Sequence, residues 1–196
     1  KGIGTFRLDA HGVAAHAGVA PQDGAAAVTE IARQVLALQA LEDPARGTTI
    51  NTGVISGGTR TNVIAEHASI EVDVRVSERA EQARIEAAWD ALRAHDPRVV
   101  LTRHGGFDRP PMERGPQSRA LYELARHAGA SMGIDVAEGS TGGASDGNFT
   151  AALGIPTLDG LGADGDGAHA RHEHVVIESL TDRAALAAAI LLALDE

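Results

Sequence analysis

The chain has 196 residues, 43% of them hydrophobic, which is enough to bury one medium-sized core or two small ones. Its 27 acidic and 17 basic residues give a formal net charge of −10, and no run of Lys or Arg suits a phosphate backbone, so we expect no nucleic-acid partner. No apolar stretch approaches the roughly 20 residues that span a bilayer, so we expect no membrane segment. Cysteine is absent, which excludes disulfides and leaves imidazole and carboxylate as metal ligands.

The first residues, Lys1-Gly2-Ile3, carry neither an initiator methionine nor a signal-peptide pattern. We therefore expect the chain to be a fragment or a processed product. A cysteine-free chain suits both a reducing and an oxidising compartment, so the sequence leaves the location open between cytoplasm and periplasm.

The chain begins with a strand-like segment over residues 4–13, followed by Gly, Pro and Asp residues at 18–24 that predict a loop. Apolar residues then recur at helical spacing from 24 to 41, which predicts an amphipathic helix with Asp23 as its cap. A β-prone segment at 48–55 follows, and Gly57-Gly58 separates it from the next strand.

Residues 62–76 predict one long strand with a period of two. Its face with Ile70, Val72, Val74 and Val76 is apolar, and the opposite face is polar, which is typical of an antiparallel sheet with one solvated or ligand-facing side. A second helix over 80–95 and a strand opening at 99 complete the order β-α-β-β-α-β. This order predicts a ferredoxin-like α+β domain over residues 1–108, with two helices on one face of a four-stranded sheet.

Residues 109–196 predict a second, α/β region. Its elements are helices at 117–132, 148–153 and 180–194 and short strands near Val136 and at 156–158. Helices that alternate with buried strands suit a domain with parallel character. At under 90 residues, it resembles part of such a domain.

Three clusters in the first region are candidate site residues. His16 lies among small residues at a strand-to-loop junction, where an imidazole suits a substrate carboxylate or an oxyanion, although a lone histidine is also often structural. Asn62 follows Gly57-Gly58 and offers an amide donor, with a plain turn as the alternative. Arg75, on the polar face of its strand, could bind a carboxylate through two hydrogen bonds or simply be solvated.

A fourth cluster joins two glycine-rich loops, 142–147 and 165–173, on either side of the strand predicted at 156–158. Loops at strand ends are where α/β proteins build sites, so we expect both loops to emerge from neighbouring parts of one sheet. His169, held between small residues with Glu173 nearby, suits a transition-metal ligand. The alternative is that 142–147 is an ordinary helix start.

Taken in order, these segments resemble the M20 family of metallopeptidases, in particular the glutamate carboxypeptidase type. The resemblance spans essentially the whole chain. It rests on five motifs: Gly-x-Ala-x-His-Ala-Gly at 12–18, Gly-Gly-x-x-x-Asn-x-Ile at 57–64, Asp-x-Arg at 73–75, Gly-Gly-x-Ser-Asp at 142–146, and Gly-x-Gly-x-His-x-x-x-Glu at 165–173. Each motif is weak alone, and their common order makes the resemblance specific.

The resemblance implies a lid or dimerisation domain at 1–108 and the C-terminal segment of a catalytic domain at 109–196. It implies a homodimer formed through the lid domain and two zinc ions that activate water for attack on an amide. The substrate would be a small peptide or an N-acyl amino acid with a free carboxylate, releasing a glutamate-like residue. The implied roles are metal ligand for His169, catalytic contact with the partner subunit's site for His16, and substrate binding for Asn62, Arg75, Arg109, Gly142 and Gly143.

The family's other metal ligands and its catalytic glutamate precede the lid domain, and no matching segment lies upstream of it here. We therefore expect this chain alone to be inactive and to bind metal weakly, through His169. Ala65, where the family commonly has proline, is a smaller departure. Two alternatives stay open: a non-catalytic dimerisation or binding module, and a deacylase or decarbamoylase of N-acyl amino acids.

Overall fold

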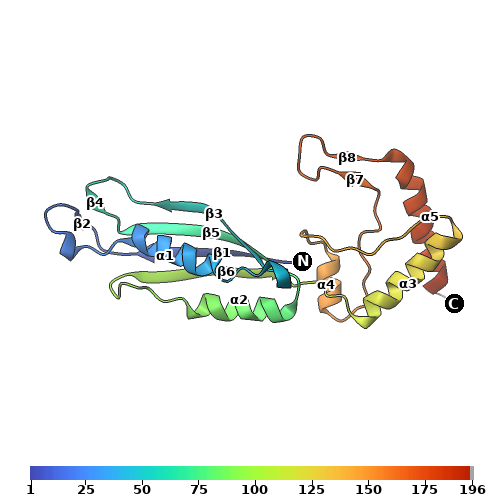
Figure 1. Ribbon diagram of the computed structural model, residues 1–196, viewed down its shortest axis with the longest axis horizontal. Helices are drawn as coiled ribbons and strands as arrows, with labels where there is room; N and C mark the ends of the chain where they lie inside the picture. Colours follow the sequence, from blue (N-terminus) through green and yellow to red (C-terminus); the bar gives the residue numbers. More distant parts are fainter. Residues whose placement is uncertain (195–196) are drawn as a thin grey trace. The chain divides into compact units, whose positions relative to one another are not determined.

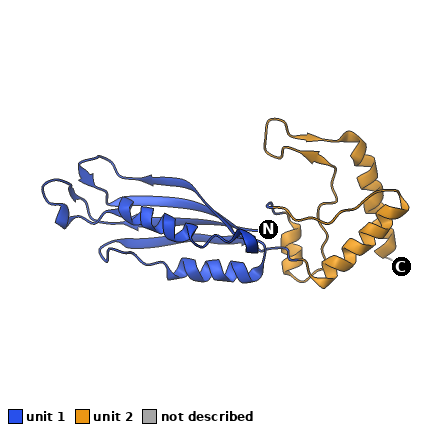
Figure 2. Cartoon of the chain, viewed as in Figure 1, with its two compact units in different colours: residues 1–113, 142–144 blue, residues 114–141, 145–196 orange. Residues whose placement is uncertain are grey.

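The computed structural model describes residues 1–194 and divides into two compact units. The first unit comprises residues 1–113 together with the short segment 142–144 (Figure 2). The second unit comprises residues 114–141 and those from 145 onward. Each unit has its own hydrophobic core, and each is described separately below.

The first unit is a four-stranded sheet in which every neighbouring pair of strands is antiparallel. In spatial order its strands are β3 (Thr49–Gly57), β5 (His67–Val76), β1 (Gly2–His11) and β6 (Val100–Arg109). Two helices, α1 (Ala27–Gln39) and α2 (Arg79–Ala91), pack against it (Figure 1). The predicted β-α-β-β-α-β order and ferredoxin-like arrangement are therefore confirmed.

The core of this unit follows the period-two pattern of the strands. Ile70, Val72, Val74 and Val76 are all buried on the face that contacts the helices. Burying each such side chain contributes about 1.5–3 kcal/mol. Since alternate residues point to opposite faces, the same register leaves the polar residues of β1 and β5 on the open face of the sheet.

The strand predicted over 62–76 is in fact two strands. β4 (Val63–Ile64) pairs with β2 (Ala15–His16) in a separate two-stranded sheet, and β5 begins only at His67. The break falls at Ala65 and Glu66 because their carbonyls accept hydrogen bonds from Ala27 (2.8 Å) and Gly12 (2.7 Å), away from the main ladder.

The first helix also begins later than predicted, and Asp23 does not cap it. Asp23 lies in a short 3-10 helix, η1 (Pro21–Asp23), whereas α1 starts at Ala27. The intervening Ala25 forms a two-way bridge with Val13, in which each backbone N–H donates to the other residue's carbonyl at 2.9 Å. This extended pairing prevents the chain from turning into the helix earlier.

Helix α2 ends at Ala91, four residues before the predicted end at His95. The buried carboxylate of Glu30 on α1 accepts hydrogen bonds from the backbone N–H groups of His95 (3.0 Å) and Asp96 (3.4 Å). Burial alone would raise the pKa of Glu30, but hydrogen bonds from Gln34 and His95 lower it below its usual value. Backbone groups that bind Glu30 cannot also continue the helix.

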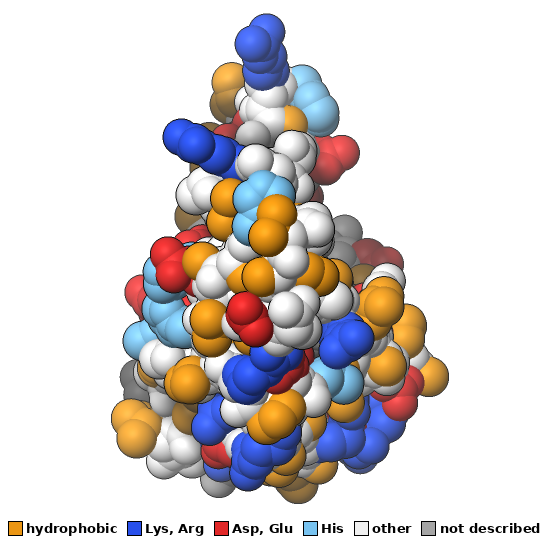
Figure 3. Space-filling model, turned by 90° about the vertical axis from the view of Figure 1, so that its left-hand side faces the viewer, with side chains coloured by type: hydrophobic (Ala, Val, Ile, Leu, Met, Phe, Trp, Pro, Cys, Tyr) orange, Lys and Arg blue, Asp and Glu red, His pale blue; other side chains and the backbone are white. Residues whose placement is uncertain are grey.

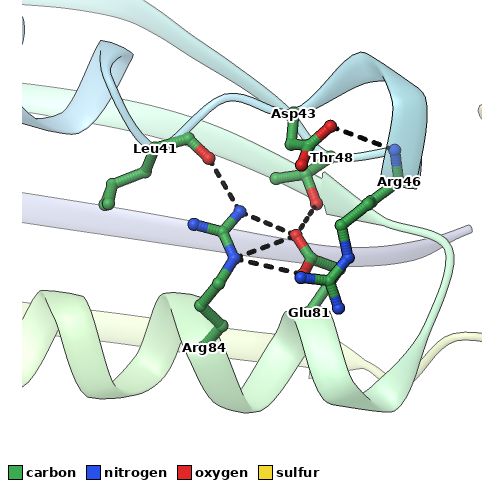
Figure 4. A network of polar contacts seen from close by, with 6 residues as sticks. All are labelled: Leu41, Asp43, Arg46, Thr48, Glu81 and Arg84. Carbon is green, nitrogen blue, oxygen red and sulfur yellow. Dashed lines mark hydrogen bonds and ion pairs between the residues drawn. The ribbon is translucent and has the colours of Figure 1, made fainter.

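A second buried carboxylate, Glu81, joins α2 to the segment before β3 (Figure 4). It accepts hydrogen bonds from the Thr48 hydroxyl (2.6 Å) and from Arg84 Nη2 (2.6 Å), and it forms an ion pair with Arg46 (2.7 Å). Arg84 also donates to the carbonyl of Leu41 (2.8 Å). The Arg84 hydrogen bond is the main cause that lowers the pKa of Glu81 from 4.5 to about 2.

The second unit consists mainly of helices α3 (Pro116–Ser131), α4 (Gly147–Ala152) and α5 (Ile177–Leu194). Its small core contains Ala125 on α3 and Leu186 and Ile190 on α5. All three helices match the positions predicted from the sequence, 117–132, 148–153 and 180–194, to within a few residues at each end. None of the helices in residues 1–194 is long and apolar enough to span a membrane.

The parallel character predicted for this region is wrong for the part of the chain that the structure describes. The segments near Val136 and at 156–158 are not strands, although Val136 and Leu158 pack against the helical core. The carbonyl of Val136 accepts a hydrogen bond from the Tyr122 hydroxyl (3.2 Å) instead of joining a ladder. The strands found here, β7 (Gly165–Asp166) and β8 (His174–Val175), form an antiparallel hairpin.

Candidate functional site

His16 lies at the end of the two-stranded β2–β4 sheet, where it is directly opposite Val63. Its side chain is exposed. The ring atom Nδ1 accepts hydrogen bonds from the backbone N–H groups of Gly18 (3.2 Å) and Val19 (3.1 Å). A nitrogen that accepts two hydrogen bonds carries no proton, so the neutral ring has its proton on Nε2.

The turn therefore fixes His16 in one tautomer and directs an N–H donor to the outside. A held donor of this kind suits a carbonyl oxygen or an oxyanion, as the sequence predicted for this residue. Gly12, at the start of the same motif, makes the corner possible because a Cβ there would lie 2.0 Å from the carbonyl oxygen of Ala25. The glycine of the motif is thus explained by a close backbone approach.

Asn62 lies beside His16, in the loop that leads into β4. Its backbone carbonyl accepts a hydrogen bond from Ala17 (3.0 Å), the residue after His16. Both residues are exposed. The structure therefore brings His16 and Asn62 together, although they are 46 positions apart in the sequence.

Arg75 and Arg109 lie at the other end of the sheet, in one row of residues that crosses it. Arg75 on β5 is opposite Ile3 on β1, and Ile3 is opposite Arg109 on β6. Residues directly opposite one another share a face, so the two arginines are on the open face with Cα atoms about 10 Å apart. Arg75 Nε also donates a hydrogen bond to the Asp73 carboxylate (2.9 Å), and this hydrogen bond raises the pKa of the Arg75 guanidinium above its usual value.

Gly142 and Gly143 belong to the same end of the first unit. Arg75 Nη1 donates to the carbonyl of Gly142 at 2.9 Å, and the backbone nitrogen of Lys1 donates to the carbonyl of Gly143 at 2.8 Å. Four of the predicted substrate-binding residues, namely Arg75, Arg109, Gly142 and Gly143, are therefore close to one another. In this arrangement the carbonyls of Gly142 and Gly143 accept the hydrogen bonds that hold residues 142–143 against the first unit.

The two groups of residues are far apart within one copy of the chain. From Arg75 to His67 the strand β5 rises through eight residue-to-residue steps, or about 26 Å, and the β2–β4 sheet lies at the His67 end (Figure 1). A single small carboxylate cannot contact Asn62 at one end and Arg75 at the other. The structure thus separates Asn62 from the remaining residues predicted to bind substrate.

His169 lies in the loop of the β7–β8 hairpin. Its φ angle is 66°, a left-handed conformation that is uncommon for a residue with a side chain, and the ring is exposed. The turn is closed by a hydrogen bond from Ala170 to the carbonyl of Gly167 (2.7 Å). The predicted strand between the two glycine-rich loops is not formed, so the expectation that they emerge from one sheet is wrong.

Residues 1–194 contain no group of three or more His, Asp or Glu side chains arranged to hold a metal ion. His169 by itself supplies one imidazole. The described residues therefore do not fit a pair of zinc ions on their own. A metal-binding role for His169 stays a prediction.

The antiparallel sheet covered by two helices, with the His16 corner at one end, agrees with the class that the motifs implied, a peptidase dimerisation domain. The family described as "Peptidase dimerisation domain" matches residues 1–99. The chain belongs to the M20 peptidase family, and the resemblance drawn from its motifs is confirmed.

Individual relatives agree with this assignment. Carboxypeptidase G2 of Pseudomonas sp. (strain RS-16) is 29% identical over 98% of this chain and 47% of its own length. The uncharacterized protein YqjE of Bacillus subtilis is 31% identical over 92% of this chain and 48% of its own length. The chain thus spans about half the length of these curated relatives.

Solved structures give the same result for the fold. The aminopeptidase PepT of Bacillus cereus has a TM-score of 0.71 and 26% identity, covering 96% of this chain and 51% of PepT. The YXEP protein of Bacillus subtilis, described as a dinuclear metal-binding peptidase of the M20 family, has a TM-score of 0.69 at 18% identity, covering 97% of this chain and 50% of YXEP. At 18% identity, the similarity to the YXEP protein is evidence of a shared fold only.

Proposed function

We propose that this chain is the dimerisation domain and part of the catalytic domain of a zinc-dependent M20 amidohydrolase. The substrate would be a small peptide or an N-acyl amino acid, and the product a C-terminal, glutamate-like amino acid. In this proposal residues 1–108 are the lid or dimerisation domain and 109–196 belong to the catalytic domain. The observation that carries the proposal is the His16 corner, where the family's motif holds an N–H donor outward.

Residues 1–194 do not by themselves hold the metal pair, so we propose that the isolated chain is inactive and that His169 supplies one ligand of a larger site. The test is to purify the 196-residue chain, add excess zinc, and assay N-acyl amino acids and dipeptides. We expect no turnover above the no-protein control. Measurable turnover that disappears in His169→Ala would overturn this part of the proposal.

The wide separation of the two groups supports a site shared between two copies of the protein. His16 and Asn62 of one copy would contact substrate bound near Arg75, Arg109, Gly142 and Gly143 of the other. The Nε2–H of His16 would then donate to the scissile carbonyl and stabilise the oxyanion as it forms. Loss of one such donor lowers kcat by about 100- to 1000-fold.

Mixed dimers of the full-length protein distinguish a shared site from a site within one copy. We would co-express His16→Ala and His169→Ala protomers, each inactive as a homodimer. With random pairing, half the dimers are mixed and each has one intact shared site, so activity should return to about a quarter of wild type. A mixture as inactive as either parent would show that His16 acts within its own copy.

The two arginines favour a substrate with a free carboxylate. Both lie on the open face of the sheet with Cα atoms about 10 Å apart, and a guanidinium can bind a carboxylate through two parallel hydrogen bonds. In the full-length protein, Arg75→Ala with Arg109→Ala should raise KM strongly. An unchanged KM would refute carboxylate recognition here, while activity on N-carbamoyl or N-acetyl amino acids would favour a decarbamoylase or deacylase.

A non-catalytic dimerisation module is the second candidate, and a specific surface favours it. Strand β3 is an edge of the sheet, yet it exposes Val54 (51%) and Ile55 (62%). Edge strands with exposed apolar side chains tend to pair with another chain. We propose that a second copy covers β3, consistent with the family description.

Light scattering after size exclusion tests this surface. Ile55→Lys should convert a dimer to a monomer at micromolar concentration. Val100→Lys is the matched control, because Val100 is equally exposed (62%) but lies on β6 at the opposite edge. A wild-type monomer, or a dimer disrupted only by the Val100 change, would refute pairing through β3.

A further inference from the structure

A pair of histidines faces each other on the open side of the sheet. His11 and His67 are directly opposite in the last pairing of the β1–β5 ladder. Their Nδ1 atoms are 3.0 Å apart, and the ring centroids are 5.0 Å apart with an interplanar angle of 82°. Both side chains are exposed, so neither is held there by burial in a core.

The surroundings of His67 favour a free lone pair on Nδ1. The Glu66 carboxylate lies 3.7 Å from Nε2 of His67, on the other side of the ring from His11. A nearby carboxylate favours the proton on the nitrogen that faces it, as it does for histidines that bind metals through their other nitrogen. With Nδ1 of His67 as the acceptor, the 3.0 Å contact is a hydrogen bond donated by the Nδ1–H of His11, and a metal ion that binds both nitrogens takes the place of that proton.

The spacing of the two nitrogens suits one metal ion bound to both. With metal–nitrogen bonds of about 2.0–2.1 Å, a separation of 3.0 Å gives a nitrogen–metal–nitrogen angle near 90°. That angle corresponds to adjacent positions in the tetragonal geometry of Cu²⁺ or Ni²⁺. A slight opening of the pair would give the tetrahedral angle that Zn²⁺ adopts, and small rotations of exposed rings can direct both lone pairs at the ion.

Room for the remaining ligands is present beside the pair. His11 and His67 line a hollow of about 420 Å³, together with Arg7, Asp9 and Glu66 among other residues. No third His, Asp or Glu completes a metal cluster anywhere in the described residues 1–194, so water molecules would fill the other positions. Figure 3 shows histidine side chains next to acidic ones on this end of the molecule.

We propose that His11 and His67 form a binding site for a divalent transition-metal ion, with Cu²⁺, Ni²⁺ and Zn²⁺ as its class of ligand. Its two ligands, on β1 and β5, are different residues from His169, the one metal ligand that the family resemblance implies in this chain. A bound ion would link the two central strands and stabilise the first unit according to its concentration. The proposal does not depend on catalysis.

The test is a titration of the metal-free chain with CuCl₂, NiCl₂ and ZnCl₂ by calorimetry at pH 7.5. His169, His172 and His174 are changed to alanine beforehand, so that the hairpin cannot bind the ion. We expect one ion per chain and a copper EPR spectrum with two coordinated nitrogens. His11→Ala and His67→Ala should each weaken binding at least about tenfold.

His104→Ala is the matched control. His104 lies on the same open face and is paired with Asp9 at 3.4 Å, but it is not part of the facing pair. Its loss should leave the affinity unchanged. The proposal is overturned if no ion binds, if the His11 and His67 variants bind as tightly as their parent, or if His104→Ala weakens binding equally. Trp89 fluorescence, which reports on the core of this unit, confirms that each variant is folded.

Discussion

The buried carboxylate of Glu81 gives the sharpest prediction about stability. Its side chain is fully buried, while its cationic partners Arg46 and Arg84 are 47% and 33% exposed. Changing Glu81 to Gln keeps the shape but removes the charge that both arginines contact. Breaking a buried ion pair costs about 3–5 kcal/mol, and because these arginines can regain water we expect the lower end, about 3 kcal/mol.

The lowered pKa of Glu81 predicts how this stabilisation depends on pH. The pKa of Glu81 is lowered from 4.5 to about 2, mainly by the Arg84 hydrogen bond. At about 1.36 kcal/mol per pKa unit, this difference is worth up to about 3 kcal/mol. Since the folded pKa is the lower one, the stabilisation is fully present above pH 4.5 and is lost as the pH falls toward 2.

The assay is urea unfolding followed by the fluorescence of Trp89, the one tryptophan in the sequence, which is buried in the first unit. The free energy of unfolding would be measured from pH 7 down to pH 3 for wild type and Glu81→Gln. Glu71→Gln is the control, because Glu71 pairs with Arg7 on an exposed surface and should cost under about 1 kcal/mol. A loss below about 1 kcal/mol for Glu81→Gln at pH 7, or identical acid dependence in both proteins, would refute the reasoning.

Three further substitutions test the packing. Phe6→Ala should lower the free energy of unfolding by about 3–5 kcal/mol, because the buried Phe6 ring packs edge-on against Trp89 at 5.0 Å; an unchanged urea midpoint would contradict this. Gly12→Ala should cost about 1–3 kcal/mol and speed hydrogen exchange of the Ala25 amide, since its Cβ would meet the Ala25 carbonyl; unaltered exchange would argue against that contact. Leu186→Ala should cost the second unit about 2–5 kcal/mol, seen as lost helical circular dichroism at lower urea, and no shift would show that this core is dispensable.

The candidate site was predictable where its signal lay in short segments. The Gly-x-Ala-x-His-Ala-Gly motif identified His16, and the period of two placed Arg75 on the polar face of β5. The sequence missed the facing pair of His11 and His67, because neither belongs to a motif. The alternation of apolar and polar residues in the sequence predicts which residues of β1 and β5 lie on the open face of the sheet. Which of them are directly opposite one another depends on the register of β1 against β5, which the alternation does not give.

The sequence by itself determined the first unit's element order, the buried face of its sheet and its family, because alternation and helical periodicity are local and each strand or helix carries its own pattern. Only the tertiary structure decided where long-range hydrogen bonds override those patterns. The carbonyls of Ala65 and Glu66 bind partners far along the chain and break the predicted strand, and the carboxylate of Glu30 ends α2 early. The structure also decided that Asn62 and Arg75 are at opposite ends of one sheet, because distance in space follows strand length and pairing rather than motif order.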